Sequence, residues 1–209
     1  MNEPFTGRIA YPGLRPFTRE EFDLFFGREN CVDQMVDTLA ASRFLAVLGT
    51  SGSGKSSLVR TGLLNALELG FLASAGSDWQ IADLRPGGHP IRSLAVALLG
   101  LEGIAQPEEG EIEILSSFLR RGPRSLVEWY EAGHLPDGAN LLVLVDQFEE
   151  LFRYEDYSGR EEAEAFVALL IEAARETDLP LHVVITMRSE YLGACTLIDG
   201  LPEFINRGL

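Results

Sequence analysis

The residues best suited to chemistry lie in one stretch, which reads Gly49-Thr50-Ser51-Gly52-Ser53-Gly54-Lys55-Ser56-Ser57. Its glycines let the backbone curl so that successive N–H groups point inward, and such a concavity can hold several negative oxygens. Lys55 is the only lysine in the chain, and its compact ammonium group suits the terminal phosphates of a nucleotide. The G-x-x-x-x-G-K-[ST] spacing predicts a P-loop at residues 49–56, with contacts to the nucleotide along the whole stretch. The alternative is a glycine-rich turn that binds nothing.

A carboxylate suited to a metal ion follows the apolar run at residues 141–145, where Asp146 ends the run. The Ser56 hydroxyl and the Asp146 carboxylate are hard oxygen ligands, so we expect them to hold a Mg²⁺ ion that bridges the terminal phosphates. We expect the strands that carry Lys55 and Asp146 to be neighbours. The alternative for Asp146 is an aspartate that only caps a helix.

Hydrolysis of a phosphoanhydride needs a carboxylate that orients the attacking water and takes its proton. Glu149 is the first candidate and Glu150 the second, and the alternative is a pair of solvated acids at the start of a helix. Arg188 is expected to contact the γ-phosphate or to stabilise charge in the transition state together with Lys55. An ordinary surface ion pair is the alternative for Arg188.

A further nucleotide contact is expected from the N-terminal part, where Arg28 follows Gly27. The alternative for Arg28 is a structural salt bridge.

The elements that must position these residues alternate along the chain. Short apolar runs predict strands at 44–48, 79–84, 141–146 and 181–186, and helical spacing predicts helices at 29–41, after the P-loop, at 91–101 and at 160–175. Further helices are indicated by the apolar positions between 112 and 130. Such βαβ units predict an α/β fold, a three-layer α/β/α sandwich with a mainly parallel sheet, of the P-loop NTPase type. Ligands of such sheets gather beyond the carboxyl ends of the strands.

The composition sets limits on domain organisation and partners. The 209 residues fit one domain, which we divide into an N-terminal arm and helix at 1–43 and a P-loop core at 44–209. A net charge of −15 disfavours a general surface for nucleic acid or anionic membranes, so we expect neither among the partners. The two cysteines, Cys31 and Cys195, suit neither a disulfide framework nor a zinc site, and a reducing cytoplasm fits best.

Six motifs together give the chain a family resemblance over nearly its whole length. They are Tyr11-Pro-Gly-Leu-Arg-Pro-Phe17, Phe26-Gly-Arg-Glu29, residues 49–57, Arg85-Pro-Gly87, Asp146-Gln-Phe-Glu-Glu150 and Thr186-Met-Arg188. The chain resembles the STAND class of signal-transduction ATPases, related to AAA+ and NACHT proteins, and specifically its bacterial novel-STAND branch. The resemblance implies that Gly27 and Arg28 lie near the adenine, that Arg188 senses the γ-phosphate, and that Glu149 and Glu150 act despite the glutamine at 147.

The resemblance also implies further parts, because members of the class continue into a fifth strand, a helical lid and a winged-helix module. We therefore expect a nucleotide-binding part that stops before the lid and is C-terminally incomplete. The parent protein would carry sensor and effector domains and form a homo-oligomer.

These expectations combine into a Mg²⁺-dependent module that binds ATP, hydrolyses it slowly to ADP and acts as a signal-transduction switch. A non-catalytic scaffold stabilised by nucleotide is the first alternative. A small-molecule kinase is the second, because it shares the P-loop but also needs an acceptor pocket.

Overall fold

The computed structural model describes residues 29–153 and 159–209, so the predicted N-terminal arm, Gly27 and Arg28 lie outside the described residues. The described part contains a four-stranded sheet in which every pairing is parallel and the order is β1-β4-β3-β2. The strands are β1 (Phe44–Gly49), β2 (Trp79–Leu84), β3 (Asn140–Val145) and β4 (Leu181–Arg188). This arrangement of strands and helices confirms the predicted α/β class and is consistent with a P-loop NTPase fold.

The strand order corrects one prediction. The strand before the P-loop and the strand before Asp146 were expected to be neighbours, but β4 lies between β1 and β3. Local apolar patterns identify strands without indicating which strands pair, so the order depends on packing that no short segment encodes. The central strands β3 and β4 are buried on both faces, which explains their unbroken apolar sequences.

Helices connect the strands and cover the sheet. In chain order they are α1 (Glu29–Ser42), α2 (Lys55–Ser57), the π-helical segment η2 (Leu58–Leu63), α3 (Leu64–Glu68), α4 (Pro90–Leu101), α5 (Glu109–Leu119), α6 (Ser125–Glu131), α7 (Glu150–Arg153), α9 (Arg160–Arg175), the 3₁₀ segment η3 (Ser189–Leu197) and α10 (Leu201–Arg207). The predicted helix after the P-loop is therefore one helical run, from α2 to α3, with a π-helical middle. Its sequence carries no signal that predicted this local widening.

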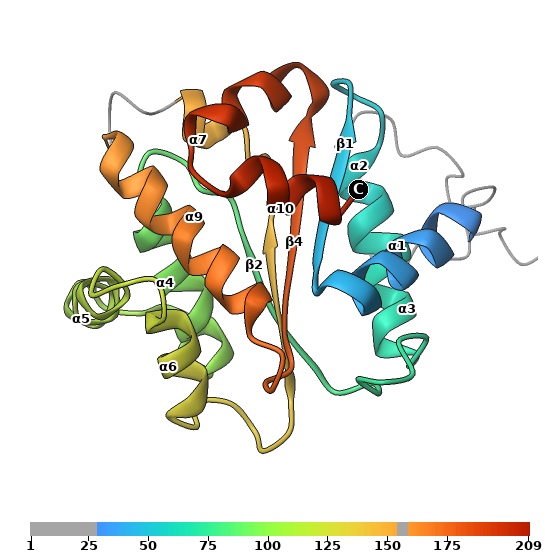
Figure 1. Ribbon diagram of the computed structural model, residues 1–209. Helices are drawn as coiled ribbons and strands as arrows, with labels where there is room; N and C mark the ends of the chain where they lie inside the picture. Colours follow the sequence, from blue (N-terminus) through green and yellow to red (C-terminus); the bar gives the residue numbers. More distant parts are fainter. Residues whose placement is uncertain (1–28, 154–158) are drawn as a thin grey trace, which may run out of the picture.

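The two faces of the sheet carry separate apolar clusters because side chains alternate along each strand. Val143 and Ile185 belong to the larger cluster, with helices α4, α5, α6, α9 and α10. Leu144 and Val184 belong to the smaller cluster, with α1 and the helical run after the P-loop. Figure 1 shows these two groups of helices on opposite sides of the sheet. The residues that follow β1, β3 and β4 consequently meet at one edge, where the strands end.

Candidate functional site

The P-loop follows β1 directly, and its glycines give it a left-handed turn. Gly52 and Gly54 have φ angles of 73° and 82°, in the region that L side chains rarely adopt. The helical run begins at Lys55, immediately after Gly54. The Lys55 ammonium lies inside the loop, where Nζ donates hydrogen bonds to the carbonyl oxygens of Gly49 (2.9 Å) and Thr50 (2.8 Å). The loop therefore surrounds the only lysine of the chain.

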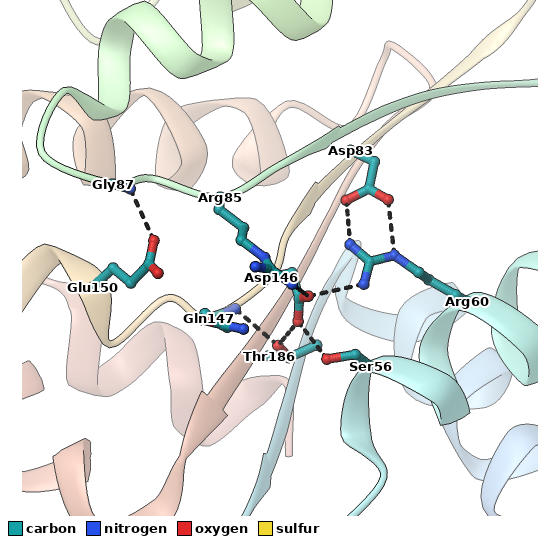
Figure 2. Close-up of polar contacts among 9 residues, drawn as sticks. All are labelled: Ser56, Arg60, Asp83, Arg85, Gly87, Asp146, Gln147, Glu150 and Thr186. Carbon is teal, nitrogen blue, oxygen red and sulfur yellow. Dashed lines mark hydrogen bonds and ion pairs between the residues drawn. The ribbon is translucent and has the colours of Figure 1, made fainter. Parts of the chain in front are cut away.

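Asp146 lies against the first turn of the helical run, as Figure 2 shows. Its side chain is 1% exposed, and its Oδ1 accepts hydrogen bonds from Ser56 Oγ (2.7 Å) and Thr186 Oγ1 (2.6 Å). Burial alone raises the pKa of the carboxyl, but the hydrogen bonds from Thr186 and Ser56 and the charge of Arg60 outweigh it and leave the pKa below its usual value. Asp146 is thus held as a buried anion.

The register of the strands explains why these groups meet. Val145 of β3 pairs with Ile185 of β4, so Asp146 and Thr186 follow at the same level and point to the same face. This face is the one that carries Leu144 and packs against α1 and the helical run after the P-loop. Ser56 reaches Asp146 from that run across the end of β4.

Arg60, which sequence reasoning missed, and Arg85, from the Arg85-Pro-Gly87 motif, complete this cluster. Arg60 of the helical run donates from Nε and Nη2 to the two carboxylate oxygens of Asp83 (2.9 and 2.8 Å) and from Nη1 to Asp146 Oδ2 (2.9 Å). Arg85 also approaches Asp146 Oδ2, at 3.7 Å. A usable signal existed for Arg60, because it follows Ser56 by four residues and so lies about one helical turn further along the same face. Its pairing with Asp83 depends on the strand order and carries no local signal.

The two acids predicted to activate water have different partners. Glu149 is 4% exposed and lies beside Arg188, with Arg188 Nε at 3.4 Å from its Oε1 and the Arg188 main-chain N–H donating to its Oε2 at 3.3 Å. Arg188 also pairs with Glu190 at 3.3 Å. The structure therefore brings Glu149 and Arg188 together at the end of β4.

Glu150 turns the other way. Its Oε2 accepts a hydrogen bond from the main-chain N–H of Gly87 (3.0 Å), in the loop that follows β2, and Figure 2 shows its carboxylate directed away from Ser56. This contact joins the start of α7 to the Arg85-Pro86-Gly87 loop. Glu150 has the geometry of a loop anchor, which favours Glu149 as the residue that could meet a reacting water.

Comparison with known proteins identifies the family. The family described as Novel STAND NTPase 1 matches this chain over residues 10–209. The chain belongs to this family. No curated protein and no solved structure matches it. Membership of an NTPase family supports nucleotide binding in general terms and confirms the resemblance described above.

The oxygen ligands of this novel STAND NTPase fit a magnesium ion that arrives with a nucleotide. Within 29–153 and 159–209, no group of three or more His, Cys, Asp and Glu side chains could hold a metal ion by itself. The Ser56 hydroxyl and the Asp146 carboxylate are instead in direct contact at 2.7 Å. Mg²⁺ usually binds one or two such protein oxygens and completes its shell with phosphate and water. The residues present fit that pattern.

The predicted nucleotide contacts of the N-terminal part, Gly27 and Arg28, lie outside the described residues. Their proximity to a nucleotide stays a prediction. Within the described ranges of this novel STAND NTPase, no helix combines the length and apolarity needed to cross a membrane.

Proposed function

We propose that this chain binds ATP with Mg²⁺ at the P-loop and hydrolyses it slowly to ADP, as the nucleotide-dependent switch of a signalling protein. The observation that carries the proposal is the hydrogen bond of 2.7 Å from Ser56 Oγ to Asp146 Oδ1, beside a loop that surrounds Lys55. These residues lie where ligands of parallel sheets bind, beyond the carboxyl ends of the strands. A purely structural turn would not need a hydroxyl, a carboxylate and an ammonium group at one place.

Each residue has a proposed role in this reaction. Lys55 and the main-chain N–H groups of residues 49–57 bind the phosphates, and Ser56 and Asp146 hold the metal ion. Mg²⁺ would supply charge neutralisation at the terminal phosphates. Glu149 orients the attacking water and takes its proton, and Arg188 contacts the γ-phosphate.

We further propose that the nucleotide acts through the pair formed by Glu149 and Arg188. An arginine that contacts a γ-phosphate must divide its charge between that phosphate and its acidic partner. The strength of the contact between Arg188 and Glu149 would therefore differ between the ATP and ADP states. In the parent protein this difference would bias contact with sensor and effector domains and homo-oligomer formation. The described residues would then form part of one P-loop domain that works in the cytoplasm.

Binding of labelled ATP to the purified chain and to Lys55→Ala tests the proposal. We expect at least about a tenfold loss of affinity, because a charge-assisted contact to phosphate is removed. Arg124→Ala is the matched control, since it also removes one positive charge but pairs with Glu172 and Glu176 at the end of α9. Equal ATP affinity of Lys55→Ala and the unaltered chain would contradict the proposal.

The single lysine offers a second readout. Because Lys55 is the only lysine, acetylation at a lysine reports on the P-loop alone. We expect ATP with Mg²⁺ to slow this modification, as measured by mass spectrometry.

A second candidate function is a scaffold that binds nucleotide without hydrolysing it. It is favoured by the fact that Glu149 and Glu150 both have protein partners, Arg188 and the Gly87 N–H. Phosphate release by Glu149→Gln and Glu150→Gln separates the two functions. A hydrolase predicts about a hundredfold loss in Glu149→Gln and little change in Glu150→Gln, because general base catalysis contributes about 10²–10⁴. Unchanged release in both variants would favour the scaffold.

A further inference from the structure

Arg60 is shared between two carboxylates that differ in exposure. Its guanidinium forms a two-point contact with Asp83, which is 38% exposed, and a single contact with Asp146, which is 1% exposed. Asp83 comes from β2, and Asp146 follows the neighbouring β3. Figure 2 shows the guanidinium between the two acids. Arg60 could therefore lose one partner and keep the other.

The contact with Asp146 uses the oxygen that the hydroxyls leave free. Ser56 and Thr186 both donate to Oδ1, whereas Arg60 donates to Oδ2 at 2.9 Å. Since Ser56 and Thr186 are neutral, Arg60 is the nearest of the cations that lie against this buried anion, ahead of Arg85 at 3.7 Å. A buried carboxylate without a cation is costly, so Arg60 neutralises Asp146 when no metal ion does.

A divalent cation bound to Asp146 would repel the guanidinium group of Arg60, and both cations would draw on the same carboxylate. Arg60 already contacts Asp83 through two parallel hydrogen bonds, the geometry in which planar guanidinium and carboxylate groups pair best. It could therefore release Asp146 without a large movement. The side chain would keep its partner on β2 when it releases Asp146.

We propose that Arg60 is a built-in counter-cation that competes with the metal ion for Asp146, and that Asp83 holds Arg60 when the metal ion is bound. The proposal rests on the metal and nucleotide site proposed above. Arg60 and Asp83 are positioning residues in this view, since they act on the nucleotide through Asp146. They would set how strongly Mg²⁺ tightens nucleotide binding.

The measured quantity is the metal coupling, defined as the Kd for a non-hydrolysable ATP analogue in EDTA divided by its Kd with Mg²⁺. Arg60→Met removes the charge and keeps the length of the side chain, and we expect it to raise the coupling about tenfold, the worth of one charge-assisted contact. Asp83→Asn removes the alternative partner, so Arg60 binds Asp146 more firmly and the coupling falls by about threefold to tenfold. The two changes act in opposite directions.

The double variant Arg60→Met/Asp83→Asn should behave like Arg60→Met alone, because Asp83 acts only through Arg60. Arg124→Met is the matched control, since its arginine pairs with Glu172 and Glu176 at the end of α9 and should leave the coupling unchanged. Thermal melting gives an independent readout, with a larger rise of Tm on adding Mg²⁺ and the analogue in Arg60→Met than in the unaltered chain.

A merely structural ion pair predicts lower melting temperatures in both variants with an unchanged coupling, and that result would overturn the proposal. A lower coupling in Arg60→Met would overturn it as well, because Arg60 would then assist the metal ion. If Arg60→Met does not fold, the metal coupling of Asp83→Asn alone tests the proposal, which requires it to be lower than that of the unaltered chain. Failure of the unaltered chain to bind the analogue would instead reject the proposed function, and with it the competition.

Discussion

The two ends of the parallel sheet use their polar side chains differently. At the amino ends, polar side chains bind the main chain: Asn140, the first residue of β3, donates from Nδ2 to the carbonyls of Ala75 (2.7 Å) and Asp78 (2.9 Å). Arg43, just before β1, donates to the carbonyls of Thr177 (2.8 Å) and Leu179. These contacts tie loops to strands, and each carbonyl would lose one hydrogen bond if the side chain moved.

At the carboxyl ends, Lys55, Glu149 and Glu150 also contact main-chain groups, but a second set of polar side chains bind one another. Ser56, Asp146, Arg60 and Asp83 form one chain of contacts of 2.7–2.9 Å across the helical run, β3 and β2. Such contacts can be exchanged for a ligand without leaving main-chain groups unpaired, because every member is a side chain with more than one possible partner. The comparison teaches that two similarly buried polar residues, Asn140 at the start of β3 and Asp146 after its end, have different kinds of partner: main-chain carbonyls for Asn140 and other side chains for Asp146.

Strand β3 allows the sharpest test of this difference, because Asn140 begins it and Asp146 follows its end. Asp146→Asn should reduce the gain in nucleotide affinity from Mg²⁺ by about a hundredfold, since a charged ligand is replaced by a neutral one of the same shape. The measurement is a titration of the nucleotide analogue with Mg²⁺ and with EDTA.

The matched control is Asn140→Ala at the other end of the strand. It should lower the free energy of unfolding by roughly 1–3 kcal/mol, because the main-chain carbonyls of Ala75 and Asp78 each lose a hydrogen bond. Its nucleotide affinity should not change. A loss of nucleotide affinity in Asn140→Ala similar to that in Asp146→Asn would break the comparison.

His182, near the amino end of β4, extends the comparison to pH. Burial lowers its pKa to about 4, and the nearby charge of Arg43 adds to the effect. Because the folded pKa lies below the unfolded value of about 6.5, the unfolded chain binds the proton first, so stability is complete above pH 6.5 and falls as the pH drops toward 4. From pH 7 to pH 5 the loss should reach roughly 2 kcal/mol.

Urea unfolding of the unaltered chain and His182→Leu at pH 7 and pH 5 measures this loss as a difference. The leucine variant should lack the contribution of His182, whereas His134→Leu, in which an exposed ring stacked on Trp129 is removed, should keep it. The same dependence on pH in the unaltered chain and His182→Leu would show that the buried ring has no part in acid sensitivity.

The sequence predicted the contacts at the carboxyl ends of the strands only in part. The spacing of residues 49–56 and the polar residue that ends each apolar run indicated that Ser56 and Asp146 would meet, because carboxyl ends of parallel strands gather at one edge. The strands agreed with the apolar runs to within about two residues, since strands buried on both faces need unbroken apolar sequence.

The contacts that depend on tertiary order could not be predicted. Arg60 pairs with Asp83 because β2 and β3 are neighbours, and Glu150 meets Gly87 because α7 starts beside the loop after β2. Neither pairing leaves a periodic or compositional trace. The sequence ranked Glu149 ahead of Glu150, but their different partners, Arg188 and the Gly87 N–H, became visible only in the structure.

The smallest expected effect concerns backbone strain at the two ends. Among the described residues, Arg43 and Gln147 are the non-glycine residues with positive φ, at 56° and 58°. Gln147 is held through its main chain, because its N–H donates to Thr186 Oγ1 (3.1 Å) and its C=O accepts from the Glu150 N–H (2.9 Å). Gln147→Gly keeps both contacts and relieves the strain, so the free energy of unfolding should rise by about 0.5–1 kcal/mol.

Arg43→Gly relieves similar strain but removes the side-chain contacts with Thr177 and Leu179, so its free energy of unfolding should fall instead. Urea unfolding of both variants measures the two signs, and a gain in both would mean that the amino-end contacts contribute less to stability than the strain they impose.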